Sequence, residues 1–109
     1  MHLDLHVHST CSDGALSPRE LVAAARRAGL GMIALADHDT TAGVEPARAA
    51  AAALGGIGVI TAIELTCLLD GAELHLLGYA FRGDDPAIAV AQKLIRAYPH
   101  VDARLIVGN

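Results

Sequence analysis

The sequence predicts an α/β fold in which short parallel strands alternate with helices. Residues 3–8 alternate between apolar and polar side chains, which is typical of a strand. Residues 32–36 and 57–63 are continuous apolar runs of the kind found in strands buried on both faces. Helix signals separate these three strands. The order βαβαβ with short turns implies parallel strands joined by right-handed crossovers.

The two helices of this pattern have clear ends. Ser17 offers an N-cap, Pro18 suits the first helical position, and Glu20 completes a capping box. This helix should stop at Gly29, because glycine readily adopts the left-handed conformation that ends helices. The second helix is expected over residues 44–54, before two consecutive glycines.

The rest of the chain contains a hairpin signal and a further helix. Asp70-Gly71 separates two strand-like segments at residues 66–69 and 73–79, a pattern typical of a tight β-hairpin. A third helix is expected to about Tyr98 after the Asp84-Asp85-Pro86 cap, and residues 104–107 could form a last strand.

Composition limits the possible functions. The 109 residues are 53% hydrophobic and carry a net charge of −4, which argues for one small globular domain and against binding nucleic acid through a broad basic face. Two cysteines beside six histidines suggest a reducing compartment. The chain opens without a signal-peptide pattern, and its mostly apolar stretch at residues 57–69 is too short to cross a bilayer. We therefore expect a cytoplasmic protein with no membrane partner.

Candidate ligand residues follow the strands. His6 and His8 lie two apart on the first strand, so both side chains point to one face. The second strand ends in Asp37-His38-Asp39, and the third strand ends in Glu64. Because ligands bind at the carboxyl ends of parallel strands, these groups should converge on one rim.

Asp13 on the following turn and His75 on the hairpin complete a set of nitrogen and oxygen donors that suits Zn, Mn or Fe better than Mg or Ca. Simpler interpretations exist for single residues. Asp13 could serve its turn alone, and Asp37 or Asp39 could only cap a helix. Glu64 is harder to explain in this way, because a buried carboxylate without a partner is costly.

These residues resemble the polymerase-and-histidinol-phosphatase (PHP) family. The similarity is greatest to its small stand-alone phosphoesterases, in particular those that act on nucleotide or nucleoside bisphosphate phosphates. The matching segments are residues 4–9, 12–14, 36–39, Glu64 and 74–79.

The resemblance implies the N-terminal half of a distorted seven-stranded βα barrel with up to three divalent ions. His6 and His8 would hold one ion, Asp13 and His38 a neighbouring one, Glu64 would bridge ions, and His75 would serve a third. A metal-activated water would then hydrolyse a small phosphorylated substrate. Asp4, Asp37 and Asp39 would orient the imidazoles from outside the ligand set.

The chain also departs from the family pattern. It lacks the later histidine and Asp-x-His pair, so the resemblance also allows an inactive metal-binding module, or a homo-oligomer whose copies complete the barrel. Residues 84–105 are similar to a segment of ceramide glucosyltransferases that carries no catalytic motif. We therefore expect a metal-binding half-barrel over residues 1–81 and a helix–strand tail over residues 82–109.

Overall fold

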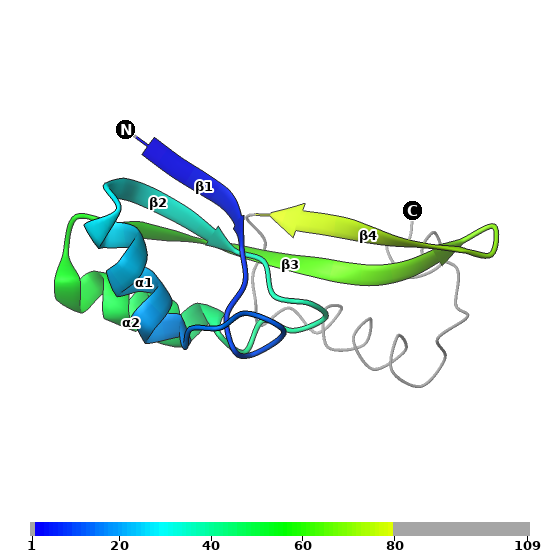
Figure 1. The fold of residues 1–109 in the computed structure, drawn as a ribbon, viewed down its shortest axis with the longest axis horizontal. Coiled ribbons are helices and arrows are strands. Elements are labelled where there is room, and N and C mark those ends of the chain that lie inside the picture. The colour runs from blue at the N-terminus through cyan, green and yellow to red at the C-terminus, as the bar shows by residue number, and fades with distance from the viewer. Residues whose placement is uncertain (1, 80–109) are drawn as a thin grey trace.

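The computed structural model describes residues 2–79, apart from the side chains of residues 67–69, and shows a curled four-stranded sheet covered on one face by two helices (Figure 1). The sheet order is β1-β2-β3-β4, in which β1 to β3 are parallel and β4 is antiparallel to β3. This arrangement confirms the predicted α/β fold with part of a barrel. The elements are β1 (His2–Val7), α1 (Pro18–Arg27), β2 (Leu30–Leu35), α2 (Val44–Leu54), β3 (Gly58–Leu69) and β4 (Ala72–Tyr79).

Helix α1 begins and ends as its sequence predicts. The Glu20 backbone N–H donates to Ser17 Oγ over 3.1 Å, and the Ser17 N–H donates to Glu20 Oε1 over 3.2 Å. These bonds satisfy N–H groups that have no partner inside the helix. The helix closes at Ala28, and Gly29 follows with a φ of 87°.

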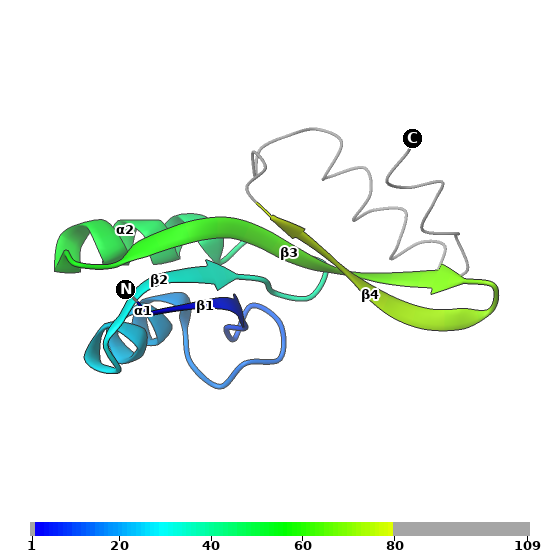
Figure 2. The ribbon, with the colours of Figure 1, turned by 90° about the horizontal axis from the view of Figure 1, so that it is seen from above.

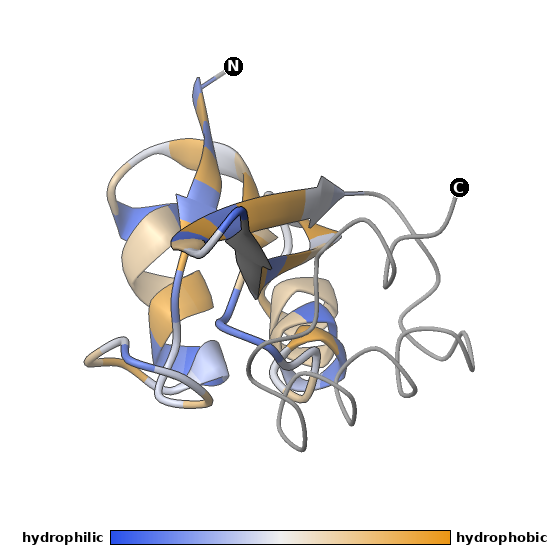
Figure 3. Ribbon diagram, turned by 90° about the vertical axis from the view of Figure 1, so that its right-hand side faces the viewer, coloured by the Kyte–Doolittle hydropathy of each residue, from blue (hydrophilic) through white to orange (hydrophobic). Residues whose placement is uncertain are grey.

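The hydrophobic core lies between the helices and the sheet (Figures 2 and 3). Val22 of α1 is fully buried, and alanines 47 and 51 of α2 are almost so. They pack with Ile33 and Leu35 of β2. The small alanine side chains let α2 approach closely, so the core holds the three parallel strands in one rigid layer.

Strand β3 differs from its prediction. We expected one strand to end at Glu64 and a separate hairpin strand to begin at Thr66, whereas β3 runs without a break from Gly58 to Leu69. Residues 58–61 pair with β2, and residues 62–69 pair with β4. The neighbouring strand that β3 pairs with therefore changes from β2 to β4 close to Glu64. The polar residue is tolerated inside the strand because polar groups surround its carboxylate.

The β3–β4 hairpin bends back toward β1. Asp70 and Gly71 have φ values of 51° and 80°, as a type I′ turn requires. At the other end of β4, the Tyr79 hydroxyl donates to the carbonyl oxygen of Leu5 over 2.8 Å. The first and fourth strands therefore contact each other even though two strands separate them in the sheet. This contact shows that the sheet is strongly curled.

The third helix and the last strand that the sequence predicts lie outside the described residues. Within residues 2–79, neither helix has the length and apolar character that a membrane crossing requires.

Candidate metal centre

Glu64 lies at the middle of the site and is 4% exposed. Its backbone N–H donates to the Asp37 carbonyl over 3.0 Å, and its carbonyl accepts from the Asp39 N–H over 2.9 Å. His38, between them, forms a parallel bridge with Glu64. The backbone after β2 thus fixes the position of Glu64 on β3.

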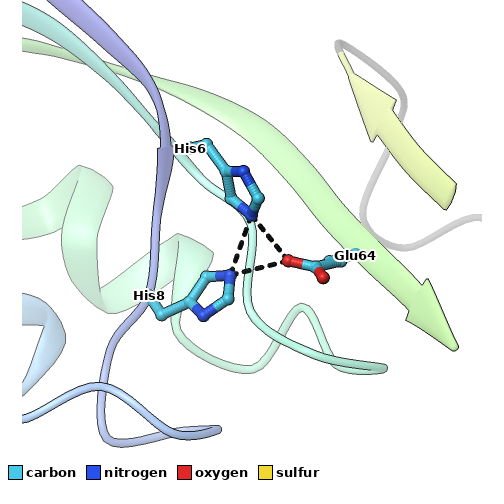
Figure 4. A group of neighbouring side chains, drawn as sticks. All are labelled: His6, His8 and Glu64. Atoms are coloured by element: carbon cyan, nitrogen blue, oxygen red, sulfur yellow. Dashed lines mark hydrogen bonds and ion pairs between the residues drawn. The ribbon is translucent and has the colours of Figure 1, made fainter. Parts of the chain in front are cut away.

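Four imidazoles surround the Glu64 carboxylate. Oε1 lies 2.6 Å from Nε2 of His6 and 2.9 Å from Nε2 of His8 (Figure 4). Oε2 lies 2.5 Å from Nδ1 of His75 and 3.6 Å from Nδ1 of His38. Each carboxylate oxygen therefore faces two imidazoles. The pair at Oε1 comes from one segment at the end of β1, and the pair at Oε2 comes from two segments far apart in the chain.

Asp13 joins the set from the loop after β1. Its Oδ1 lies 2.6 Å from Nδ1 of His8, and its Oδ2 lies 3.1 Å from Nε2 of His38. The His8 and His38 rings meet edge to face, with centroids 4.6 Å apart. The structure thus brings together all six residues that the sequence singled out as candidate ligands.

Three overlapping groups in this set could each hold an ion, because the ligand atoms of each group lie within 4.8 Å of one another. A neutral imidazole has one lone pair, so His8 and His38 can each serve only one ion at a time. Glu64 can serve two, because each of its oxygens faces a different pair of imidazoles. The groups are His6–His8–Glu64, His8–Asp13–His38 and His38–Glu64–His75.

The donor chemistry fits divalent cations. Neutral imidazole nitrogens and carboxylate oxygens are the usual ligands of Zn and related metals. Four imidazoles around one buried carboxylate exceed what a single negative charge needs for hydrogen bonding. A cation cluster would use these lone pairs, so the residues present fit the metal ions that the sequence predicts.

Electrostatics keep both acidic ligand candidates ionised. A hydrogen bond from His8 is the main reason that the pKa of Asp13 is lowered. Burial opposes ionisation of Glu64, but hydrogen bonds from His6 and His8 and the charge of His38 outweigh it and lower its pKa. Ionised carboxylates at neutral pH are the form that binds metal.

The three predicted outer residues have different contacts. Asp4 accepts from the backbone N–H of His6 over 3.0 Å, not from its ring. The Asp37 carboxylate, 1% exposed, bonds to Ser9 and Ser12 instead of to an imidazole. Asp39 accepts from the Thr66 N–H over 2.7 Å. Asp4 and Asp37 thus act on the backbone and on hydroxyl groups rather than on ligand rings.

The sequence did not identify the serines as part of this site. Ser9 is fully buried and gives two hydrogen bonds to Asp37, and Ser12 gives a third. Their positions directly after His8 and before Asp13 are the signal that could have identified them. Hydroxyls beside two ligands are well placed to fix the loop that carries both.

Comparison with known proteins establishes the family. The family model for the PHP domain matches residues 4–99. The chain belongs to the PHP domain family of metal-dependent phosphoesterases. This match includes residues 84–99, which the similarity to ceramide glucosyltransferases had set apart, and the division into residues 1–81 and 82–109 stays a prediction.

Individual relatives agree with this assignment. A 5′-3′ exoribonuclease of Haemophilus influenzae is 44% identical over 96 residues, which cover 85% of this chain and 35% of the relative. A 3′,5′-nucleoside bisphosphate phosphatase of Chromobacterium violaceum is 39% identical over 95 residues, which cover 87% of this chain and 33% of the relative.

A solved structure shows the same fold. The amidohydrolase from Chromobacterium violaceum, crystallised with sulfate and without metal, superposes with a TM-score of 0.83 at 37% identity, over 89% of this chain and 34% of that one. The chain thus spans about a third of the length of these relatives.

Proposed function

We propose that this PHP-family chain provides metal ligands for hydrolysis of a small phosphate monoester, such as one phosphate of a nucleotide or nucleoside bisphosphate. The observation that carries the proposal is the Glu64 carboxylate, whose two oxygens each face two imidazoles. One such carboxylate can bridge two cations. The ions we propose are Mn, Zn or Fe, up to three in the family and fewer from these residues alone.

Different residues of the chain would bind different ions. His6 and His8 would hold one ion with Oε1 of Glu64, and His75 would hold a second with Oε2. Asp13 and His38 would provide ligands beside them. When bound, the ions would lower the pKa of a coordinated water to near neutrality and offset the charge of the phosphate. Asp13 stays ionised because its pKa is lowered, so it acts as a ligand or acceptor and not as a proton donor.

Two relatives support a phosphate ester as the substrate. The Chromobacterium violaceum relative is a 3′,5′-nucleoside bisphosphate phosphatase, and the related amidohydrolase holds sulfate, which resembles phosphate in shape and charge. The basic side chains of residues 2–79, which are Arg19, Arg26, Arg27 and Arg48, all lie on α1 and α2. In the described part of the chain, the strands that carry the site therefore offer ligands for cations and no cationic side chain for phosphate.

The lack of lysine and arginine on the strands of residues 2–79 favours a second candidate, a metal-binding module without turnover. A homo-oligomer that completes the barrel and a cytoplasmic location stay predictions.

Metal content and turnover separate the two candidates. The protein would be stripped with a chelator, reloaded with Mn, Zn or Fe, and assayed for bound metal and for phosphate release from a 3′,5′-nucleoside bisphosphate. We expect bound metal and phosphate release that His6→Ala and His38→Ala both abolish. Turnover that survives both substitutions would overturn the enzymatic proposal, and bound metal without turnover would favour the module.

A further inference from the structure

The tripeptide Asp37-His38-Asp39 lies between two ligand-bearing segments. It begins two residues after the end of β2, and His38 takes part in two of the three candidate metal groups. The carboxylates on either side of His38 point to different neighbours. Asp37 contacts the loop after β1, and Asp39 contacts β3.

Asp37 fixes the loop that carries His8 and Asp13. Its Oδ1 accepts from the Ser9 N–H over 2.6 Å and from the Ser12 hydroxyl over 2.7 Å. Its Oδ2 accepts from the Ser9 hydroxyl over 2.7 Å. Ser9 follows His8 in the chain, and Ser12 precedes Asp13. One buried carboxylate therefore holds the loop at both ends of the segment between the two candidate ligands.

Asp39 fixes β3, which lies on the other side of His38 from the loop that Asp37 holds. Its side chain accepts from the Thr66 N–H over 2.7 Å, and its own N–H donates to the Glu64 carbonyl over 2.9 Å. Asp39 adopts a φ of 55°, a left-handed conformation that aspartate tolerates better than most residues. Thr66 pairs with His75 across the hairpin, so this contact reaches both Glu64 and His75.

Stability alone does not explain the buried Asp37. Its three donors are one backbone amide and two hydroxyls, all neutral, and a carboxyl group is among the more costly groups to bury. A carboxylate, however, can accept several hydrogen bonds from two segments at once. This capacity is useful where two segments must be held in register.

We propose that Asp37 and Asp39 are positioning residues that hold separate halves of the ligand set against His38. Asp37 holds the His8–Asp13 half, and Asp39 holds the Glu64–His75 half. The inference rests on the proposed metal site but goes beyond it, because it assigns a role to residues that ligate no ion. It predicts that the two aspartates act on different ligands.

Cobalt(II) is a suitable probe, because its visible absorption reports ligand geometry and needs no turnover. We expect Asp37→Ala and Asp39→Ala to weaken Co(II) binding about 10–100-fold, as loss of supporting partners does at other metal sites. Asp37→Asn should recover most of this loss. Its amide oxygen can accept from Ser9 N–H and Ser12, and its NH2 can donate to the Ser9 hydroxyl.

Nitrogen-15 NMR spectra of the histidine rings test the division into halves. With Zn bound, Asp37→Ala should shift the ring signals of His8 more than those of His75, and Asp39→Ala should do the reverse. Ser12→Ala removes the bond to Asp37 and a longer one, 3.5 Å, to Asp13, but it leaves both bonds from Ser9 to Asp37 in place. It should shift the His8 signals less than Asp37→Ala does. If both aspartate variants shift the same rings equally, the assignment of separate halves is wrong.

Val22→Ala provides the matched control for stability. Val22 is a fully buried residue of α1 and takes no part in the ligand set. It should lower the melting temperature without weakening Co(II) binding. Equal weakening by Val22→Ala at the same loss of stability, or an Asp37→Asn variant as weak as Asp37→Ala, would overturn the positioning role. A wild-type chain that binds no Co(II) would instead overturn the proposed metal site.

Discussion

The Nε2 atoms of His6 and His8 lie 3.1 Å apart, and both face Oε1 of Glu64. The Cα atoms of residues two apart on a regular strand lie about 6–7 Å apart, so the two rings must lean toward each other. Two nitrogen lone pairs and a carboxylate oxygen this close together suit a shared cation. The same positive charge would stabilise all three atoms.

His6→Ala should therefore remove one ion. We expect the affinity of that ion to fall by at least about tenfold, because losing even an outer partner of a ligand commonly costs this much. Metal analysis after dialysis would show a lower ratio of metal to protein. His2→Ala is the matched control, since His2 is exposed on the same strand and belongs to none of the candidate groups. Equal metal content in both variants would contradict the prediction.

Glu64 should make the stability of the metal-free protein depend on pH. Its folded pKa lies below the ordinary value of 4.5, so the ionised carboxylate stabilises the fold. This contribution is fully present above 4.5 and is lost as the pH falls through the lowered pKa. Urea unfolding with chelator, from about pH 7 to about pH 3, should show a flatter pH dependence for Glu64→Gln than for wild type.

Glu45→Gln is the control for that series. Glu45 is 82% exposed and forms a surface ion pair with Arg48. Such pairs contribute little, so this variant should keep the wild-type pH dependence. A Glu64→Gln profile that matched wild type would show that the imidazoles around the carboxylate do not stabilise its charge.

Local patterns in the sequence predicted the helices and the hairpin well. The capping residues of α1 and the Asp70-Gly71 turn act over only a few residues, and the structure places them as expected. The donor set could be predicted because parallel strands end at one edge of a sheet, which gathers His8, His38 and Glu64 without knowledge of side-chain packing.

Interactions between distant residues could not be predicted in this way. Glu64 interrupts an apolar run and therefore suggested a strand end, although β3 continues through it to pair with β4. The contact between Tyr79 and Leu5 depends on how far the sheet curls. The bonds from Ser9 to Asp37 join segments 28 residues apart, and no local pattern specifies them.

Tyr79→Phe tests how the sheet is closed. The substitution removes the hydrogen bond from the Tyr79 hydroxyl to the Leu5 carbonyl and leaves the ring in place. A hydrogen bond of this kind contributes about 0.5–1.5 kcal/mol, and we expect the lower end because Tyr79 is 40% exposed. Urea unfolding would measure the loss, and amide exchange should become faster in β1 than in β2. Unchanged exchange in β1 would mean that the contact does not hold this strand.

Gly14→Ala should disturb both the fold and the site. A Cβ at this position would lie 2.2 Å from the carbonyl oxygen of His8, so the backbone that carries His8 would have to move. Gly14 also donates its N–H to the Ser9 carbonyl over 2.8 Å, which the shift would strain. We expect a loss of about 1–3 kcal/mol of stability and weaker binding of the ion held by His8. Ala15→Ser, at the neighbouring exposed residue, should change stability by less than about 0.5 kcal/mol. If Gly14→Ala bound metal and resisted urea as well as Ala15→Ser does, the loop would not fix His8 through this close contact.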